Sequence, residues 1–261
     1  MAAPPIKLET LDPQPKRLGK CGQCPYFEAG SAPICLTCSL RSIDPLPDPA
    51  DRCPRCEQRL TEGECKNWVC DWSSRGYEWN AAIGMRSGEL KRVGDAFKLQ
   101  GVQPWGIILG RLLAGFLDAQ RERFAPFDLI IPSPGWTGQG AALPWDHAAE
   151  VVRWAADTST TSWPFELEPV IIRTKSVPPL KELRSWKARK ERAETVLRES
   201  LKVVAPEKVR RKDVLVYDDI FTDGFMLREV ARALRSAGAT RVCGVTLMRQ
   251  PYVPKAAGHA P

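Results

Sequence analysis

Short runs of consecutive apolar residues recur through the second half of this 261-residue chain. They begin at Asp128, Pro169, Asp213 and Arg241, and turn-forming or charged residues separate them. Runs that are apolar throughout, rather than alternating with polar residues, are typical of strands covered on both faces. The pattern therefore predicts a parallel β-sheet with helices on both of its sides.

Apolar residues spaced three and four apart predict amphipathic helices between these strands. The clearest stripe extends from Trp105 to Leu117, and a second helical stretch, from Trp145 to Ala156, follows the run at Asp128. A third stretch, from Leu227 to Ala237, lies between the last two strands, and Gly238 stands where a helix is expected to end. The order strand, helix, strand is that of a crossover connection in an α/β domain.

Composition divides the chain into five segments. The first is rich in proline and poor in aromatic residues, and the second holds many turn formers but few periodic apolar residues, so neither can build an ordinary core. The expected segments are a flexible arm (1–18), a cysteine-rich module (19–76), a helical hood or linker (77–126), the α/β domain (127–251) and a tail (252–261).

Eight of the nine cysteines fall in the second segment, in closely spaced pairs. Two cysteines separated by two residues can turn back onto one ion, so such a pair offers half of a tetrahedral Zn²⁺ site. The simplest grouping places Cys21, Cys24, Cys35 and Cys38 around one ion and Cys53, Cys56, Cys65 and Cys70 around another, while an interleaved grouping stays open. Four thiolates leave no open coordination position, so both zinc ions are expected to be structural. A disulfide framework is the alternative, which the regular spacing disfavours.

The segment from Val214 to Arg228 carries the strongest chemical signal. A predicted strand ends in two carboxylates, Asp218 and Asp219, and a turn containing Gly224 follows before a helix begins. Ligands of open α/β sheets bind at this end of the strands, and backbone N–H groups at a helix start attract phosphate. The carboxylates can accept hydrogen bonds from adjacent ribose hydroxyls. The segment indicates a sugar-phosphate site, with helix-capping acidic residues as the plainer alternative.

This segment resembles the fingerprint of the type I phosphoribosyltransferases, an apolar strand followed by Asp-Asp, two residues and Thr-Thr-Gly-x-Thr. The chain is similar to the ComF-like branch of that family in its N-terminal cysteine pairs, its Phe97–Gly101 and Ile131–Pro134 segments and its basic Arg173–Lys175 segment. The resemblance covers residues 21 to 250. It implies a parallel-sheet type I phosphoribosyltransferase fold preceded by a small zinc-binding module, and a glycosyltransferase of nucleotide metabolism.

The resemblance also implies roles for individual residues. Asp218 and Asp219 would be the catalytic pair that holds the ribose hydroxyls of phosphoribosyl pyrophosphate (PRPP), and Mg²⁺ would arrive with the pyrophosphate. The residues expected to bind phosphates are Thr222, Asp223, Gly224, Phe225 and Met226 around the 5-phosphate, and Ser133, Lys175, Lys181, Arg184 and Arg189 toward the pyrophosphate. Asp223 and Met226 stand where the fingerprint has threonines, so two hydroxyl donors are lost and a negative charge is placed beside the 5-phosphate.

The net charge of +7 is regional, because residues 173–212 carry 14 Lys and Arg against 5 Asp and Glu. Such a segment fits a polyanionic partner, and either a small phosphorylated molecule or a nucleic acid satisfies it, while a solvated helical face is the plainer alternative. A second hypothesis is therefore a non-catalytic adaptor that binds single-stranded nucleic acid in DNA uptake or processing, through this segment and the tryptophans of the cysteine module. A third is a sensor that passes nucleotide binding to a protein partner docked on that module.

Other features exclude or narrow some interpretations. No apolar run is long enough to span a membrane, and the first twenty residues lack the apolar stretch of a secretory signal, so the expected compartment is the cytoplasm. Asp146 and His147 are interpreted as the start of a helix rather than as an acid–base pair. Cys243 lies within an apolar run and is interpreted as a core residue.

Overall fold

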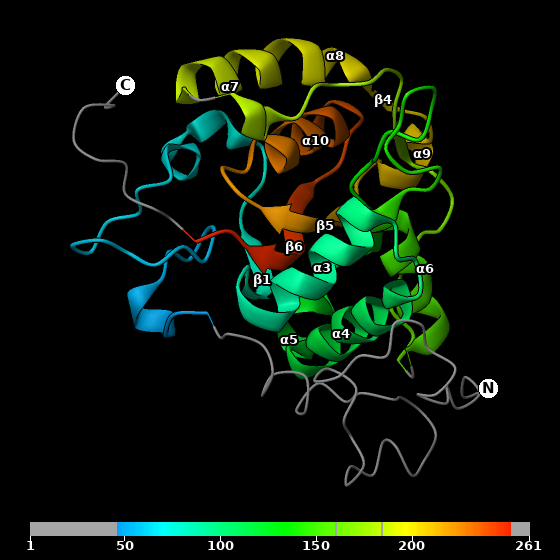
Figure 1. The fold of residues 1–261 in the computed structure, drawn as a ribbon, viewed down its shortest axis with the longest axis horizontal. Coiled ribbons are helices and arrows are strands. Elements are labelled where there is room, and N and C mark those ends of the chain that lie inside the picture. Colours follow the sequence, from blue (N-terminus) through cyan, green and yellow to red (C-terminus); the bar gives the residue numbers. More distant parts are fainter. Residues whose placement is uncertain (1–45, 160, 184, 252–261) are drawn as a thin grey trace, which may run out of the picture.

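The computed structural model describes residues 46–159, 161–183 and 185–251, and Figure 1 shows their course. They form an α/β fold around a four-stranded parallel sheet with the order β1-β6-β5-β2. The strands are β1 (Asn80–Met85), β2 (Leu129–Pro132), β5 (Asp213–Phe221) and β6 (Arg241–Arg249). In these three ranges, no helix is long and apolar enough to cross a membrane.

The two central strands, β5 and β6, pair from Asp213 against Arg241 to Phe221 against Arg249. Successive side chains of a strand point to opposite faces, so Leu215 and Tyr217 belong to one apolar cluster while Val214 and Val216 belong to the other. Both faces of the sheet are therefore buried, as the continuous apolar runs predict.

One face of the sheet is covered by α3 (Gly88–Gln100), α4 (Trp105–Ala119) and α6 (His147–Thr158), with the short α5 (Arg121–Phe124) after α4. Helices α4 and α6 approach closely at Gly110, where an added Cβ would lie 2.5 Å from the Cβ of Trp154. Asp146 caps α6 by accepting hydrogen bonds from the N–H groups of Ala148 and Ala149. The cap fixes where α6 begins, next to the end of β2.

The opposite face is covered by α10 (Phe225–Ser236) and a continuous helix of α7 (Trp186–Arg192), a π-helical turn (Ala193–Leu197) and α8 (Arg198–Ser200). Figure 1 shows α7, α8 and α10 on one side of the strands and α4 and α5 on the other. The fully buried Glu229 links α10 to the helix that contains α7 and α8. It accepts hydrogen bonds from Arg198 of α8 and from Arg228 and Arg232 of α10.

Two sequence predictions need correction. The run at Pro169 does not join the parallel sheet: β3 (Ile171–Arg173) pairs antiparallel with β4 (Leu201–Val203), which precedes α9 (Pro206–Val209). Segment 77–126, predicted to be helical, begins with β1, which pairs with β6. Segment 77–126 thus shares its sheet and core with residues 127–251.

The cysteine module packs along the outer edge of β1. The N–H of Asn80 donates to the carbonyl of Arg55 at 2.7 Å, and the N–H of Ala82 donates to the carboxylate of Glu57 at 2.6 Å. Short 3₁₀ helices complete the irregular parts: η2 (Pro49–Asp51), η3 (Trp68–Asp71) and η4 (Ser73–Arg75) in the module and η5 (Leu180–Glu182) before α7. The module therefore supplies partners for backbone groups that an edge strand would otherwise expose.

Candidate functional site

The two predicted carboxylates lie near the C-terminal end of β5, which continues past them to Phe221. As neighbours on one strand they point in different directions. Asp218 lines a small cavity beside α10, whereas Asp219 reaches toward α3 and α6. The pair therefore presents one carboxylate to the turn before α10 and the other to basic residues on the opposite helices.

Asp219 is held by two basic side chains. Its Oδ2 lies 2.5 Å from Lys98 Nζ of α3 and 3.5 Å from His147 Nε2 of α6. Burial alone raises the pKa of Asp219, but Lys98 and His147 outweigh it and keep that pKa well below the usual range. In return, burial of Lys98 is outweighed by Asp219 and Asp218, which raise the pKa of its ammonium. Asp219 is therefore a charged group whose position is fixed before any ligand arrives.

Asp218 has the opposite electrostatic character. Burial, followed by the negative charge of Asp219, raises the pKa of Asp218 to about 7. The partly buried Arg173 of β3 interacts electrostatically with both carboxylates and with Asp146. Ligand atoms of His147, Asp218 and Asp219 all lie within 4.8 Å of one another, a spacing that one divalent cation can bridge. The pair therefore combines a stable anion with a carboxyl group that can change its charge near neutral pH.

The turn Thr222 to Gly224 connects β5 to α10. Gly224 has φ +89°, and a Cβ there would lie 2.6 Å from the ring of Phe221 and 2.9 Å from the hydroxyl of Tyr77, so glycine is required. No side chain caps α10, and no group within the described residues accepts a hydrogen bond from the N–H of Thr222, Asp223 or Gly224. Free N–H groups at the start of a 12-residue helix form a site suited to a phosphate dianion.

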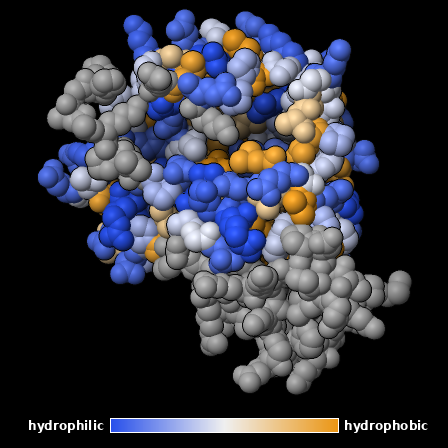
Figure 2. Space-filling model, viewed as in Figure 1, coloured by the Kyte–Doolittle hydropathy of each residue, from blue (hydrophilic) through white to orange (hydrophobic). Residues whose placement is uncertain are grey.

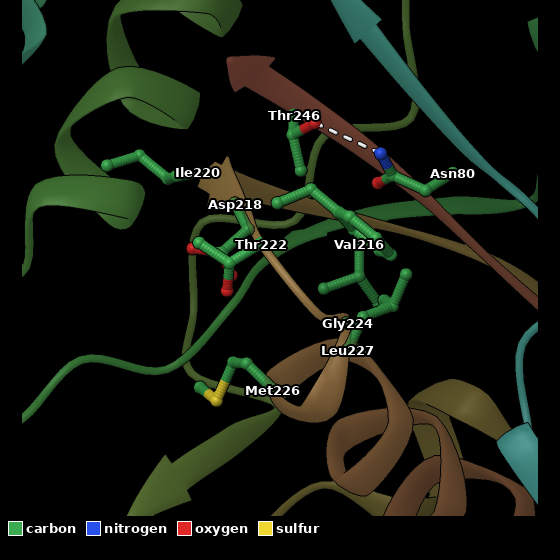
Figure 3. A pocket seen from close by; sticks show the side chains of 10 residues that line it. Asn80, Val216, Asp218, Ile220, Thr222, Gly224, Met226, Leu227 and Thr246 are labelled. Carbon is green, nitrogen blue, oxygen red and sulfur yellow. Dashed lines mark hydrogen bonds between the residues drawn. The ribbon is translucent and has the colours of Figure 1, made fainter. Parts of the chain in front are cut away.

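Asp223 is turned away from this site. Its Oδ2 accepts a hydrogen bond from Arg189 Nε of α7 at 2.7 Å, and it is not among the residues that line the cavity between β5 and α10. Figure 3 shows Asp218, Thr222 and Met226 on one side of this cavity, with Asn80 hydrogen-bonded to Thr246 on the other. The cavity measures about 20 Å³, which is enough for one water molecule.

The other residues predicted to bind phosphates lie in different surroundings. The N–H of Ser133 donates to the carbonyl of Tyr217, which places the loop after β2 beside β5. Met226 Sδ lies 3.4 Å from Arg173 Nη2, and the buried Phe225 packs against Trp72 of the cysteine module and Trp186 of α7. Lys175 is exposed and pairs with Glu199 at 2.9 Å. Arg184 and the side chain of Lys181 lie outside the described residues.

Three basic residues complete the site without having been predicted as ligands. Lys98 lies in the Phe97–Gly101 segment that carries the family resemblance, and Arg173 opens the basic segment, so both had a signal in the sequence. His147 was assigned to a helix start, where it does lie, but that position also brings its ring against Asp219. Helix capping is performed by Asp146, which also accepts a hydrogen bond from the N–H of Gly135 at 2.6 Å.

The cysteine module brings Cys53, Cys56, Cys65 and Cys70 together, as the simplest grouping predicts. All four are free thiols whose sulfur atoms lie within 4.8 Å of one another, and the Sγ atoms of Cys56 and Cys65 are 3.7 Å apart. A tetrahedral Zn²⁺ ion with bonds of about 2.3 Å separates its sulfur ligands by about 3.8 Å. The four cysteines therefore suit a metal such as zinc.

The other cysteines are different. Cys21, Cys24, Cys35 and Cys38, the ligands of the second predicted zinc ion, lie outside the described residues. Cys243 is buried in β6, where burial raises the pKa of its thiol to about 12. That environment agrees with its interpretation as a core residue rather than a ligand or nucleophile.

No protein-family model matches the chain, and no curated protein matches it. What can be said about function therefore depends on the geometry described above. Two features carry it: the carboxylate pair beside an open helix start, and the four-cysteine cluster on the adjoining sheet edge.

Proposed function

We propose that this chain binds PRPP with Mg²⁺ on a type I phosphoribosyltransferase fold and transfers the phosphoribosyl group to a nitrogen acceptor. The observation that carries the proposal is the open turn Thr222 to Gly224 beside Asp218 and Asp219, with the carboxylate of Asp223 directed to Arg189. The negative charge that the sequence places beside the 5-phosphate is thus paired outside the turn. The site keeps its N–H donors for the ligand.

Different residues of this site bind the ribose, the 5-phosphate and the pyrophosphate of PRPP in this proposal. Asp218 and Asp219 accept hydrogen bonds from the two ribose hydroxyls, and the turn before α10 holds the 5-phosphate. Lys98 and Arg173 would supply positive charge to the pyrophosphate, and Mg²⁺ bound with that group would supply further stabilisation of its negative charge. The ribose hydroxyls compete with Lys98 for Asp219, so ligand binding shifts this ammonium from its 2.5 Å contact toward the pyrophosphate.

Calorimetry with PRPP and Mg²⁺ tests the proposal directly. Asp218→Asn and Asp219→Asn each weaken charge-assisted hydrogen bonds worth about 1.5–3 kcal/mol, so a rise in Kd of roughly ten- to a hundredfold is expected. Asp213→Asn is the matched control, because Asp213 lies at the other end of β5 and pairs with Arg241. Absence of binding by the wild type, or equal affinities for all four proteins, contradicts the proposal.

Transfer is tested separately from binding. Release of pyrophosphate from PRPP is measured with a set of purine and pyrimidine bases and with ammonia as acceptors. Release that depends on an acceptor and is lost in Asp219→Asn identifies an enzyme. Binding without release for any acceptor leaves a PRPP sensor, and the transferase part of the proposal is then withdrawn.

A second candidate function is binding of single-stranded nucleic acid, favoured by an aromatic cluster beside basic α7. The partly buried Trp68 and Trp72 pack edge-on against Trp186, with ring centroids 4.9 and 5.3 Å apart, and Lys190 lies 4.9 Å above Trp72. Figure 2 shows hydrophilic residues, with hydrophobic ones among them, along the part of the surface formed by α7 and α8. Aromatic rings that keep part of their surface accessible among cations can stack on bases, and the cations can contact phosphates.

Fluorescence anisotropy with a labelled oligothymidylate in increasing salt tests this second function. Several phosphate contacts make affinity fall steeply with salt, and Trp186→Ala is expected to weaken binding at every salt concentration. Trp79→Ala is the control, because Trp79 packs against Phe124 and Phe127 on the far side of β1. Affinity that is independent of salt, or equal losses in both variants, excludes this function.

A further inference from the structure

Arg249, the last residue of β6, joins the four-cysteine cluster to the turn before α10. Its side chain is almost fully buried, with 2% of its surface exposed. Nε donates to the carbonyl of Cys56 at 2.8 Å, and Nη2 lies 3.7 Å from the Sγ of Cys56. Nη1 donates to the carbonyls of Phe221 and Thr222 at 2.9 and 2.8 Å. One rigid guanidinium therefore touches both a metal ligand and the first residue of the phosphate-binding turn.

The four-cysteine cluster with its metal also supplies negative charge that compensates the buried guanidinium of Arg249. A buried guanidinium needs a compensating negative charge, and no carboxylate within the described residues forms a salt bridge with Arg249. Four thiolates around one Zn²⁺ carry a net charge of −2, which places the compensating charge beside Nη2. When the metal leaves, Cys56 loses the ion that fixes its position, and the carbonyl and Sγ that contact Arg249 are no longer held in place. The position of Arg249 is thus coupled to metal occupancy.

Aromatic contacts connect the same two parts. The ring of Tyr77 meets the ring of Phe221 edge-on at 6.1 Å, and the ring of Trp72 lies 6.2 Å from that of Phe225. Cys53, Cys56 and Cys70 belong to the same apolar cluster as these two phenylalanines. Phe225 after the turn therefore packs on the cysteine module, and Phe221 before the turn packs on Tyr77, which directly follows the module.

We infer that metal at the four-cysteine site sets the conformation of residues 222–226, and that Arg249 is the positioning residue that transmits it. The metal is then a switch for ligand binding: with metal bound, the turn keeps its N–H groups directed outward, and without metal the turn loosens and phosphate affinity falls. The effect on ligand affinity rests on the proposed function, whereas the effect on the turn does not.

Amide hydrogen exchange on the full chain tests the effect on the turn. Zn²⁺ removal from the wild type is expected to speed exchange in the peptide covering 221–228 by at least about tenfold and to leave the α4 peptide unchanged. Arg249→Met, with zinc retained as measured by elemental analysis, is expected to show the same acceleration. Arg241→Met, on the same strand but paired with Asp213, is the control and is expected to match the wild type.

The outcomes separate this inference from the proposed function. Unchanged exchange at 221–228 after zinc removal overturns the inference, as does full protection in zinc-loaded Arg249→Met. If that variant loses its zinc, the wild-type comparison alone decides. Calorimetry with PRPP and Mg²⁺ is then run on the wild type with and without zinc, and a rise in Kd of at least about tenfold is expected. Faster exchange together with no PRPP binding in either state upholds the link and rejects the proposed ligand.

Discussion

Lys98→Met is expected to destabilise the fold because it takes a basic partner away from the buried carboxylate of Asp219. The substitution keeps an unbranched apolar side chain but removes the ammonium 2.5 Å from Asp219 Oδ2. Asp219 is then left with His147 and Arg173 as basic neighbours. Removing one partner of a buried ion pair costs about 3–5 kcal/mol. Because Lys98 keeps 32% of its side chain exposed, water screens part of the interaction, and we expect a loss of about 2 kcal/mol.

The loss should depend on pH. In the wild type, Lys98 and His147 keep the pKa of Asp219 low, so this carboxylate stabilises the fold above its unfolded pKa of about 3.9 and loses that contribution as the pH falls through the folded value. In Lys98→Met, burial is less opposed and the pKa of Asp219 rises. Protonation then relieves the buried charge in acid. The difference in unfolding free energy between wild type and variant is therefore expected to be largest near pH 8 and to shrink toward about pH 5.

Urea unfolding followed by fluorescence at several pH values measures this difference. Lys91→Met is the matched control on the same helix, because Lys91 pairs with Asp95 at 2.9 Å but keeps 48% of its side chain exposed. Its loss is expected to stay below about 0.5 kcal/mol at every pH. Equal losses in the two variants, or a loss in Lys98→Met that grows as the pH falls, would refute the assignment of Lys98 as the partner of Asp219.

Three further predictions concern the carboxylate pair and its turn. Gly224→Ala should destabilise the fold by about 1–3 kcal/mol more than the control Gly63→Ala. Both glycines have a positive φ, but only at Gly224 would the added Cβ meet neighbouring atoms. Equal urea midpoints for the two variants would count against this. Asp218→Asn should stabilise the fold at about pH 8 by at least about 1 kcal/mol. Burial raises the pKa of the Asp218 carboxyl, so its ionised form opposes folding above the unfolded pKa. A melting temperature below that of the wild type would contradict this direction. Asp223→Thr should remove a negative charge and add a hydroxyl donor at the turn, and should tighten PRPP binding in calorimetry by about tenfold. Weaker binding would show that the contact of Asp223 with Arg189 supports the turn.

The elements that the sequence predicted well are those with continuous apolar runs or clear helical stripes. Strands β2, β5 and β6 and helices α4, α6 and α10 all correspond to such segments. Strand β1 was missed because Asn80-Ala-Ala-Ile-Gly-Met has mostly small side chains, and its apolar content does not separate it from the helix that follows. The strand at Ile171 was expected, but an apolar run reports burial and says nothing about which sheet provides the partner.

The site was predictable where one segment carries it and not where several segments meet. Asp218 and Asp219 belong to a single strand and turn, so their neighbourhood follows from local sequence. Lys98 and His147 come from two other helices, and a lone lysine on an amphipathic helix looks the same whether it faces solvent or a carboxylate. Lys175 is the opposite case: the sequence predicted that it faces the pyrophosphate, but its side chain pairs with Glu199.

The contact between the cysteine module and β1 has a consequence for solubility. The module supplies acceptors for two N–H groups on the outer edge of the parallel sheet, through the carbonyl of Arg55 and the carboxylate of Glu57. An uncovered edge strand is a template for pairing with another chain. Loss of the fold of the module would therefore leave these two N–H groups open to pairing with another copy of the chain. The module that carries the four-cysteine cluster therefore also protects the chain against self-association.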